Sequence, residues 1–285
     1  MAVNGFDPAA SPLGVFGSML RYYRTRAGIS QDELGARIHF SGDLVGKIEV
    51  GQRSPTPEFT AACESVPELG ADGALTELRN VLKDYLKRRA YPAWFIRWPD
   101  KEAEARTLRW FEPLVIPGLL QTEEYARAIF RTRVGITGEE IDEMIAARME
   151  RQAILARDKP PTLWVVIDEG VLRRPVGGKH VMRDQLNHLM AAARRPNIVV
   201  QVIPASIGAH EGLRGGAFII AEQEGAADVA YQDTAARGQV IEDPDDIAEM
   251  TVLWDTLRSE ALSRAASLEL MEEVAETWTL AMSGQ

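Results

Sequence analysis

Two short runs in the chain contain residue types that could act on phosphate or acyl groups. Gly177-Gly178-Lys179-His180 has the glycine and lysine of a phosphate-binding loop, but that motif needs a glycine where Arg173 stands and a serine or threonine where His180 stands. Ser206 precedes Gly208 by two residues, as in a nucleophile elbow, but Pro204 occupies the position of the first glycine. Neither run therefore predicts a nucleotide site or a catalytic serine.

The histidines and the cysteine do not form a metal-binding pattern. No two of the four histidines are four residues apart, as two zinc ligands on one helix would be: they are His39, His180, His188 and His210. Cys63 stands alone, which excludes an internal disulfide and a zinc site built from cysteines. We therefore expect no catalytic residue, no metal and no cofactor, and a chain that is not an enzyme.

Polar residues that follow predicted strands are better candidates for binding. Asp168-Glu169 ends a strand near Arg173, which fits either a polar pocket or a structural network of ion pairs, and the network is favoured. His210-Glu211 lies in a glycine-flanked loop, and loops often carry binding residues. The candidate partner or ligand residues are therefore His210, Glu211 and Arg173, with an ordinary surface loop as the simpler alternative.

Composition and length indicate a folded protein of two domains. The chain has 285 residues, of which 46% are hydrophobic and 26% charged, so it is not disordered over its whole length. At about 100–200 residues per domain, two domains are expected. The first sixteen residues lack the basic start of a signal peptide, and no apolar stretch approaches the roughly 18 residues of a membrane span. We expect a cytoplasmic protein with no membrane contact.

The formal net charge of −10 at first argues against nucleic-acid binding, because phosphates repel an acidic protein. The charge is uneven, however. Residues 1–90 carry 11 basic and 11 acidic residues, whereas residues 221–285 carry three basic and fifteen acidic ones. Residues 79–109 are basic. This segment could lie beside DNA phosphates, but we prefer to interpret it as the solvated face of a helix and a linker. The N-terminal part therefore remains able to bind DNA.

Five helices are predicted in the first ninety residues. Apolar residues at helical spacing mark their buried faces, and the fifth is expected over about 74–89. Local signals mark where the others begin and end, namely Gly28, the capping box Ser30-Gln31-Asp32-Glu33, Ser41, Gly51 and Thr56-Pro57. The second and third helices, joined by a tight turn at His39-Phe40, have the helix-turn-helix arrangement, in which the second helix of the pair enters the major groove of DNA.

The run Ser30-Gln31-x-x-Leu34-Gly35, followed by Ser41-x-x-x-Val45-x-x-Ile48-Glu49-x-Gly51, resembles the Xre/lambda-repressor-like helix-turn-helix family over about residues 14–70. The resemblance implies an all-α, five-helix DNA-binding domain. It also implies DNA contacts. Gln31 and Arg53 would touch phosphates, and Gly42, Asp43 and Lys47 fall where the family reads base edges. Ser41, which caps the third helix, belongs to the same set of DNA-binding residues.

The predicted recognition helix has few side chains that could contact DNA bases. Gly42 and Gly46 have no side chain, and Asp43 is repelled by phosphate and can accept a hydrogen bond only from cytosine N4 in the major groove. Lys47 is the obvious donor that remains. We therefore expect little direct readout, with more weight on backbone contacts and DNA shape. The alternative is a domain that keeps the fold and has lost DNA binding.

Beyond residue 90 the pattern changes to a mixture of strands and helices. Continuous apolar runs predict strands at 163–167 and 198–203, followed by 217–220, 229–231 and 239–241. Helices are expected after Thr122, after the capping box at Thr137, over 182–193, after Asp243-Pro244 and over 267–281. The aromatic residues between 91 and 111 are interpreted as a domain-interface core. The pattern indicates a mixed α/β (α+β) domain with a small central sheet.

Several blocks in this half carry a second resemblance. They include Trp110-Phe111-Glu112-Pro113-Leu114-Val115-Ile116-Pro117-Gly118, Arg148-x-Glu150-Arg151-Gln152, Leu163-Trp164-Val165-Val166-Ile167-Asp168-Glu169 and Glu242-Asp243-Pro244. Over about residues 90–278 the chain looks like the DUF5753 domain that follows an Xre domain in WhiJ-like, antitoxin-like actinobacterial regulators. The resemblance implies a repressor paired with a small protein of the DUF397 or BldB-like class, and it supplies no catalytic residue.

The sequence thus predicts an Xre helix-turn-helix domain over residues 1–89 and a DUF5753-like effector or partner-binding domain over residues 90–285. We expect a transcriptional regulator, a repressor by default, that binds a double-stranded DNA operator as a homodimer and joins the nucleoid when it is bound to DNA. A small-molecule sensor, with a pocket between the sheet and the helices of the second domain, is the open alternative to a protein partner.

Overall fold

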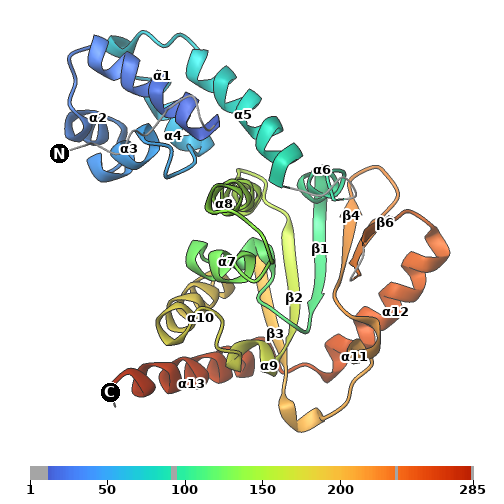
Figure 1. Cartoon of the computed structure of the whole chain (residues 1–285). Helices are drawn as coiled ribbons and strands as arrows, with labels where there is room; N and C mark the ends of the chain where they lie inside the picture. The colour runs from blue at the N-terminus through green and yellow to red at the C-terminus, as the bar shows by residue number, and fades with distance from the viewer. Residues whose placement is uncertain (1–11, 91–94, 235–236, 284–285) are drawn as a thin grey trace. The chain divides into compact units, whose positions relative to one another are not determined.

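The computed structural model describes residues 12–90, 95–234 and 237–283 (Figure 1). Its internal contacts divide the chain into two compact units. The first comprises residues 1–91 together with 137–150, and the second comprises residues 92–136 and 151–285. The domain boundary expected between residues 89 and 90 stays a prediction. The sequence did not lead us to expect that residues 137–150 group with the N-terminal helices.

The first unit is helical throughout its described part, and the five expected helices are present. Residues of all five share one hydrophobic core, in which Phe16, Leu34, Val45 and Ile48 are buried. Ala146 and Ala147 of a later helix belong to the same core. The helices are α1 (Pro12–Arg26), α2 (Gln31–Ile38), α3 (Gly42–Glu49), α4 (Pro57–Glu64), α5 (Ala74–Ala90) and α8 (Gly138–Gln152), of which α8 belongs to this unit as far as Glu150.

The predicted caps position the short helices α2, α3 and α4. The N–H of Glu33 donates to Ser30 Oγ at 3.2 Å, and Glu33 Oε2 accepts from the N–H of Ser30 at 2.7 Å, which completes the capping box. Ser41 Oγ accepts from the N–H of Leu44 at 3.1 Å at the start of α3. Because each cap binds N–H groups that a helix leaves unpaired, the beginning of the recognition helix is set by local sequence.

The second unit is built on a six-stranded mixed sheet with the order β3-β2-β1-β4-β5-β6. The pairs β1–β2 and β2–β3 are parallel, whereas β4, β5 and β6 continue the sheet from β1 in antiparallel pairs. The strands are β1 (Ala105–Glu112), β2 (Thr162–Asp168), β3 (Ile198–Ile203), β4 (Phe218–Gln223), β5 (Val229–Asp233) and β6 (Gly238–Ile241). The predicted mixed α/β class is confirmed, and the strand order is now known.

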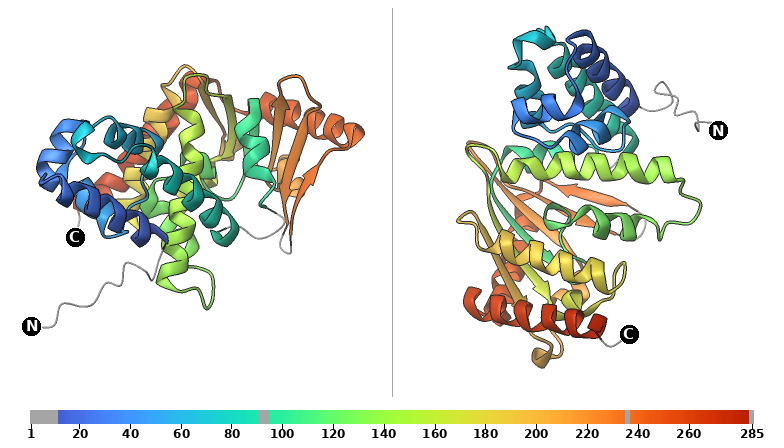
Figure 2. Two further views of the ribbon diagram at one scale, coloured as in Figure 1. Left: turned by 90° about the horizontal axis from the view of Figure 1, so that it is seen from above. Right: turned by 90° about the vertical axis from the view of Figure 1, so that its left-hand side faces the viewer.

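Helices cover both faces of this sheet, as the views in Figures 1 and 2 show. Met182 and Leu186 of α10 and Met271 of α13 pack on one face, while Trp254 and Leu257 of α12 pack on the other. None of the described helices is long and apolar enough to cross a membrane. The helices of this unit are α6 (Trp98–Glu104), α7 (Glu123–Phe130), α9 (Glu169–Arg173), α10 (Lys179–Ala193), α11 (Gly212–Gly215), α12 (Pro244–Glu260) and α13 (Arg264–Ser283).

The strand β1, which lies at the centre of the sheet, was not among the predicted strands. Trp110 and Phe111 of β1 face opposite sides and lie in the two separate cores of the unit. Arg106 and Arg109 interrupt its apolar pattern, and both pair with Glu222 of β4, at 3.1 and 3.7 Å. The described aromatic residues that were interpreted as an interface core thus lie inside the second unit, and Tyr91 and Trp94 lie outside the described residues.

Candidate nucleic-acid interface

A buried carboxylate holds the helix-turn-helix together. The side chain of Glu49, at the end of α3, is 0% exposed. Its Oε2 accepts hydrogen bonds from Arg24 Nη2 of α1 at 2.9 Å and from Gln31 Nε2 of α2 at 2.7 Å. Arg21 Nε lies 3.5 Å from the same oxygen. One side chain therefore ties the first three helices together, a role that sequence reasoning did not assign, although Glu49 is part of the motif.

The surroundings of Glu49 keep it ionised. Burial alone would favour its neutral form, but the hydrogen bonds from Arg24 and Gln31 and the positive charges of Arg24 and Arg21 outweigh burial and lower the pKa of Glu49. The same pairing raises the pKa of Arg24. A buried charge of this kind is tolerated because its partners satisfy it, and removal of one partner is costly.

The structure places Gln31 at the first position of α2, where its amide donor is already bound to Glu49. Its side chain is half-buried. In this arrangement Gln31 positions α3 relative to α2, so its predicted phosphate contact would rely on its backbone N–H or on the second N–H of its amide. That contact stays a prediction.

The two glycines of α3 lie where α2 approaches it. A Cβ added to Gly42 would lie 1.9 Å from Asp32 Oδ1 and 2.9 Å from Asp32 Cα, which is closer than atoms can pack. A Cβ added to Gly46 would lie 3.2 Å from Gln31 Oε1, the end of a flexible side chain. The absence of side chains at these positions therefore has a structural cause, the close packing of the helix pair, whether or not DNA approaches them.

The exposed face of α3 presents Asp43 and Lys47. Their side chains are 73% and 52% exposed, and Lys47 Nζ lies 2.8 Å from Asp43 Oδ2, one helical turn away. Ser41 caps the helix with its hydroxyl oxygen. The face can therefore offer DNA one ammonium group and one carboxylate, and the pair between them is weak because both side chains are more than half exposed.

Arg53 lies in the exposed segment that follows α3. Its backbone N–H donates to the carbonyl of Lys47 at 3.2 Å, and this bond holds the segment against the end of the helix. The arrangement of Lys47 and Arg53 around one helix end suits a contact with the DNA backbone. The basic segment 79–109 includes Lys83, Lys87 and Arg88, whose side chains lie outside the described residues.

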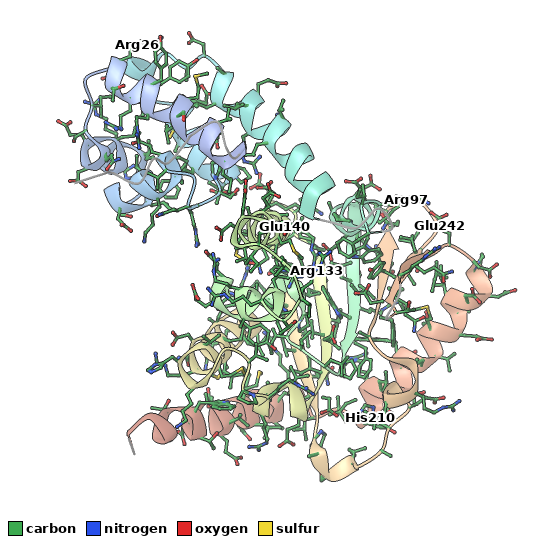
Figure 3. The ribbon with its side chains drawn as sticks, in the orientation of Figure 1. Arg26, Arg97, Arg133, Glu140, His210 and Glu242 are labelled. Carbon is green, nitrogen blue, oxygen red and sulfur yellow. The ribbon has the colours of Figure 1, made fainter. Side chains whose placement is uncertain are left out.

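The candidates in the second unit lie at the ends of its parallel strands. His210 follows β3, and its side chain is 1% exposed (Figure 3). Its Nε2 lies 3.2 Å from Asp168 Oδ2 at the end of β2, and its ring meets Phe111 edge-on at 5.9 Å. Among the described residues, no group hydrogen-bonds its Nδ1. The burial of His210 means that a partner could reach it only after the loop moved.

Arg173 and Glu211 take different places. Arg173 Nε lies 2.7 Å from Glu169 Oε1, and Glu169 Oε2 accepts from the N–H of Ala205 at 2.8 Å, so these residues form a polar network of the kind preferred above. These bonds lower the pKa of Glu169 in spite of its partial burial. Glu211 is exposed at the start of α11. The network links the loop after β3 to the end of β2, and the binding roles of the three residues stay predictions.

Comparison with known proteins identifies both halves of the chain. Residues 15–78 match a family model described as a helix-turn-helix domain. Residues 97–273, which make up more than half of the chain, match the model of a domain of unknown function, DUF5753. No curated protein and no solved structure matches the chain.

Proposed function

The chain belongs to the DUF5753 family and carries a helix-turn-helix domain in front of that family's domain, and we propose that it is an antitoxin-like transcriptional repressor that binds a DNA operator as a homodimer. The helix-turn-helix domain supports a DNA-binding regulator. The observation that carries the proposal is the α2–α3 pair itself, because Ser41 caps α3 and Glu49 fixes it so that Asp43 and Lys47 face outward.

We assign the DNA contacts as follows. Lys47 and Arg53 supply the positive charge for phosphates or for guanine, while Asp43 selects cytosine or rejects other bases. Ser41 and Gly42 bring the N-terminal end of α3 and its free N–H groups close to the DNA backbone. Gln31 supports this surface from α2. Because the charged contacts are few, affinity should be modest and should fall steeply with salt.

The second domain is proposed to bind a small partner protein of the DUF397 or BldB-like class, which then changes the affinity for DNA. The support for this is the resemblance of the whole chain and the acidity of residues 221–285, which favours a partner with a basic surface. A partner can regulate only if it binds the DNA-competent and DNA-incompetent states with different affinities. The protein would act in the cytoplasm and on the nucleoid.

A mobility shift on DNA from upstream of the protein's own gene tests the DNA-binding proposal. The double variant Lys47→Ala/Arg53→Ala should abolish the shift. Arg133→Ala/Arg214→Ala is the matched control, because it removes two exposed arginines in the second unit and changes the net charge equally. Absence of a wild-type shift at low salt, or an equal loss in both double variants, would overturn the proposal.

A second candidate function rests on the Asp43–Lys47 pair. Since the carboxylate of Asp43 lowers the positive charge that α3 presents, the domain can be a helix-turn-helix that has lost DNA binding and serves as a protein-interaction module. The same experiment distinguishes the two functions: no shift at low salt, together with stable capture of the partner protein, favours the interaction module.

A further inference from the structure

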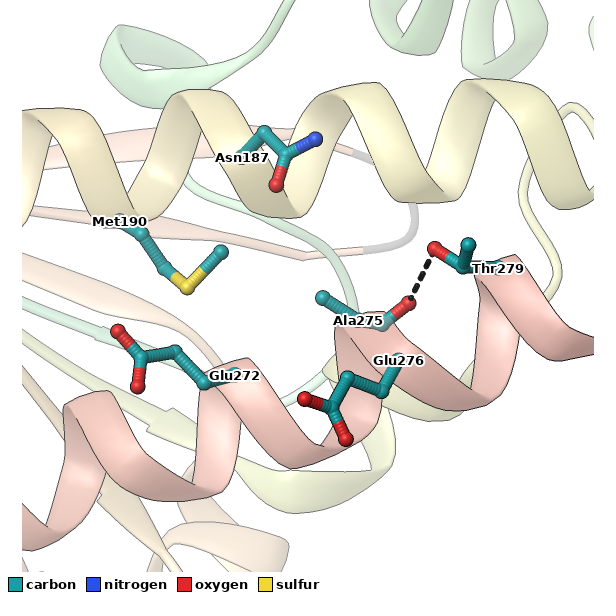
Figure 4. A pocket seen from close by; sticks show the side chains of 6 residues that line it. All are labelled: Asn187, Met190, Glu272, Ala275, Glu276 and Thr279. Carbon is teal, nitrogen blue, oxygen red and sulfur yellow. Dashed lines mark hydrogen bonds between the residues drawn. The ribbon is translucent and has the colours of Figure 1, made fainter.

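The helices α10 and α13 of the second unit enclose a surface groove that the site above does not use (Figure 4). Its volume is about 410 Å³, within the usual range of small binding pockets. The lining residues come from the two helices alone, namely Asn187, Met190, Glu272, Ala275, Glu276 and Thr279. Met190 and Ala275, each 7% exposed, form the apolar part of this lining.

The polar part of the lining is acidic. Glu272 and Glu276 lie one turn apart on α13, and both are exposed. Arg194 Nη2 lies 2.8 Å from Glu272 Oε1, but Arg194 and Glu272 are 58% and 52% exposed, so this pair is weak and can exchange partners. Within the described part of the chain, Glu276 has no ion-pair partner. The groove therefore carries an unneutralised negative charge.

The basic residues nearest in sequence have partners of their own, and on α10 Arg183 Nη2 lies 2.7 Å from Asp184 Oδ1. Arg264, the one basic residue of α13, donates to the carbonyls of Ala193 and Arg195 at 2.6 and 3.2 Å and so caps the end of α10. Glu269 and Glu273 add two more exposed carboxylates to α13. The α13 side of the groove thus belongs to the part of the chain that carries the excess acid, residues 221–285, whereas Asn187 and Met190 come from α10.

We propose that the α10–α13 groove is the docking site for a basic segment of the partner protein. A lysine or arginine of that segment would lay its aliphatic stem on Met190 and Ala275 and place its charge beside Glu276. Met190 suits this role because its flexible thioether adapts to different shapes. Asn187 Oδ1 offers a further hydrogen-bond acceptor. Phosphate groups are repelled by the same carboxylates, so the groove does not bind nucleic acid.

This inference rests on the proposed partner-binding function and adds its location. The test uses the full chain and a fluorescently labelled amphipathic peptide of leucine and lysine, with a leucine–glutamate peptide as the negative control. The variant Glu276→Lys reverses the charge in the groove. The matched control is Glu249→Lys, which makes the same change at an exposed position of α12 in the same acidic part of the chain.

Fluorescence anisotropy should show that wild type and Glu249→Lys bind the lysine peptide, and that Glu276→Lys binds it about tenfold more weakly. Equal weakening by both variants would mean that only the general negative field attracts the peptide, and it would overturn the groove as the site. Binding of spermidine at the groove without binding of the peptide would also overturn it, in favour of a small cation. So would the absence of binding by either probe.

The same samples are tested for the mobility shift, which separates this inference from the proposed regulator function. If the wild type binds the peptide but gives no DNA shift, the proposed regulator function is overturned and the groove stands as the docking site. If the DNA shift is intact but Glu276→Lys binds the peptide as well as the wild type does, the regulator function stands and the groove is not the docking site. Glu276 is exposed, so its replacement should leave the thermal unfolding of the chain unchanged, which circular dichroism can verify.

Discussion

Lys47 Nζ lies 2.8 Å from Asp43 Oδ2 on the exposed face of α3. The surface that should meet DNA therefore carries an ammonium group beside a carboxylate, and both side chains are more than half exposed. DNA must compete with Asp43 for Lys47, and Asp43 itself is repelled by phosphate. The affinity of this domain for DNA is consequently set by a pair of residues whose contributions oppose each other.

Replacement of Asp43 by asparagine should strengthen DNA binding. It frees Lys47 and removes a repulsive charge, and we expect affinity to rise about tenfold at low salt, with the salt dependence steeper by about one phosphate contact. Mobility shifts at several salt concentrations measure both effects. Glu58→Gln, which removes an exposed carboxylate from α4, is the control and should change little. Weaker binding by Asp43→Asn would instead show that Asp43 makes a favourable base contact.

Replacement of Glu49 by glutamine should loosen the helix-turn-helix. Arg24 would lose its charged partner in a largely buried place, at a cost of about 3 kcal/mol. Hydrogen exchange of amides in α1, α2 and α3 measures this loss without interference from the second unit. Glu68→Gln breaks the exposed Arg37–Glu68 pair, whose side chains are 42% and 58% exposed, and should cost less than about 1 kcal/mol. Equal exchange in the two variants would refute the role of Glu49.

The helices α2, α3 and α4 of the first unit were predictable because each has a local signal at its start. Ser30, Ser41 and Thr56 bind N–H groups within three residues of themselves. The role of Glu49 was not predictable, since its partners Arg24 and Gln31 lie in two other helices and the sequence does not show which distant charges meet. The strand β1 was not predicted for the same reason, because its arginines pair with Glu222 of a strand that comes much later in the chain.

The candidate site shows the same limit. The outward positions of Asp43 and Lys47 follow from helical spacing, which the sequence does contain. The glycines of α3 were interpreted as positions at which the DNA-facing surface has no side chains. The structure shows instead that Asp32 and Gln31 of α2 fill the space next to them. His210 was placed in a surface loop, with a contact to a ligand or partner as the alternative, but it is buried against Asp168 and Phe111 because the loop folds back onto the sheet.

The two glycines should respond differently to alanine. Gly42→Ala brings Cβ within 2.9 Å of the Asp32 backbone, so α2 and α3 must separate, and we expect a destabilisation of about 1–3 kcal/mol. Gly46→Ala meets only a movable side-chain end at 3.2 Å, and alanine favours the helix by about 1 kcal/mol. Gly46→Ala should thus be neutral or stabilising. Hydrogen exchange of α2 and α3 provides the comparison, and a reversed order would contradict the packing described here.

The second unit should lose stability as the pH rises from about 4 to about 7 because of Glu112. This carboxyl at the end of β1 is 8% exposed, and burial raises its pKa to about 7, although the N–H of Leu114 donates to its Oε1 at 3.2 Å. The unfolded chain has a glutamate pKa of about 4.3. Between these two values the folded state holds a proton that the unfolded state has released, so the free energy of unfolding falls across this window.

Glu112→Gln imitates the protonated carboxyl and should remove this pH dependence. At pH values above about 7 the variant should be more stable than the wild type by up to about 3 kcal/mol, whereas below about pH 4 the two should be alike. Hydrogen exchange of β1 and β2 amides across this range measures the difference. Glu224→Gln, an exposed carboxylate beyond β4, is the control and should follow the wild type. If Glu112→Gln is less stable than the wild type at high pH, the carboxylate is ionised and satisfied in the folded protein, and the assigned pKa is wrong.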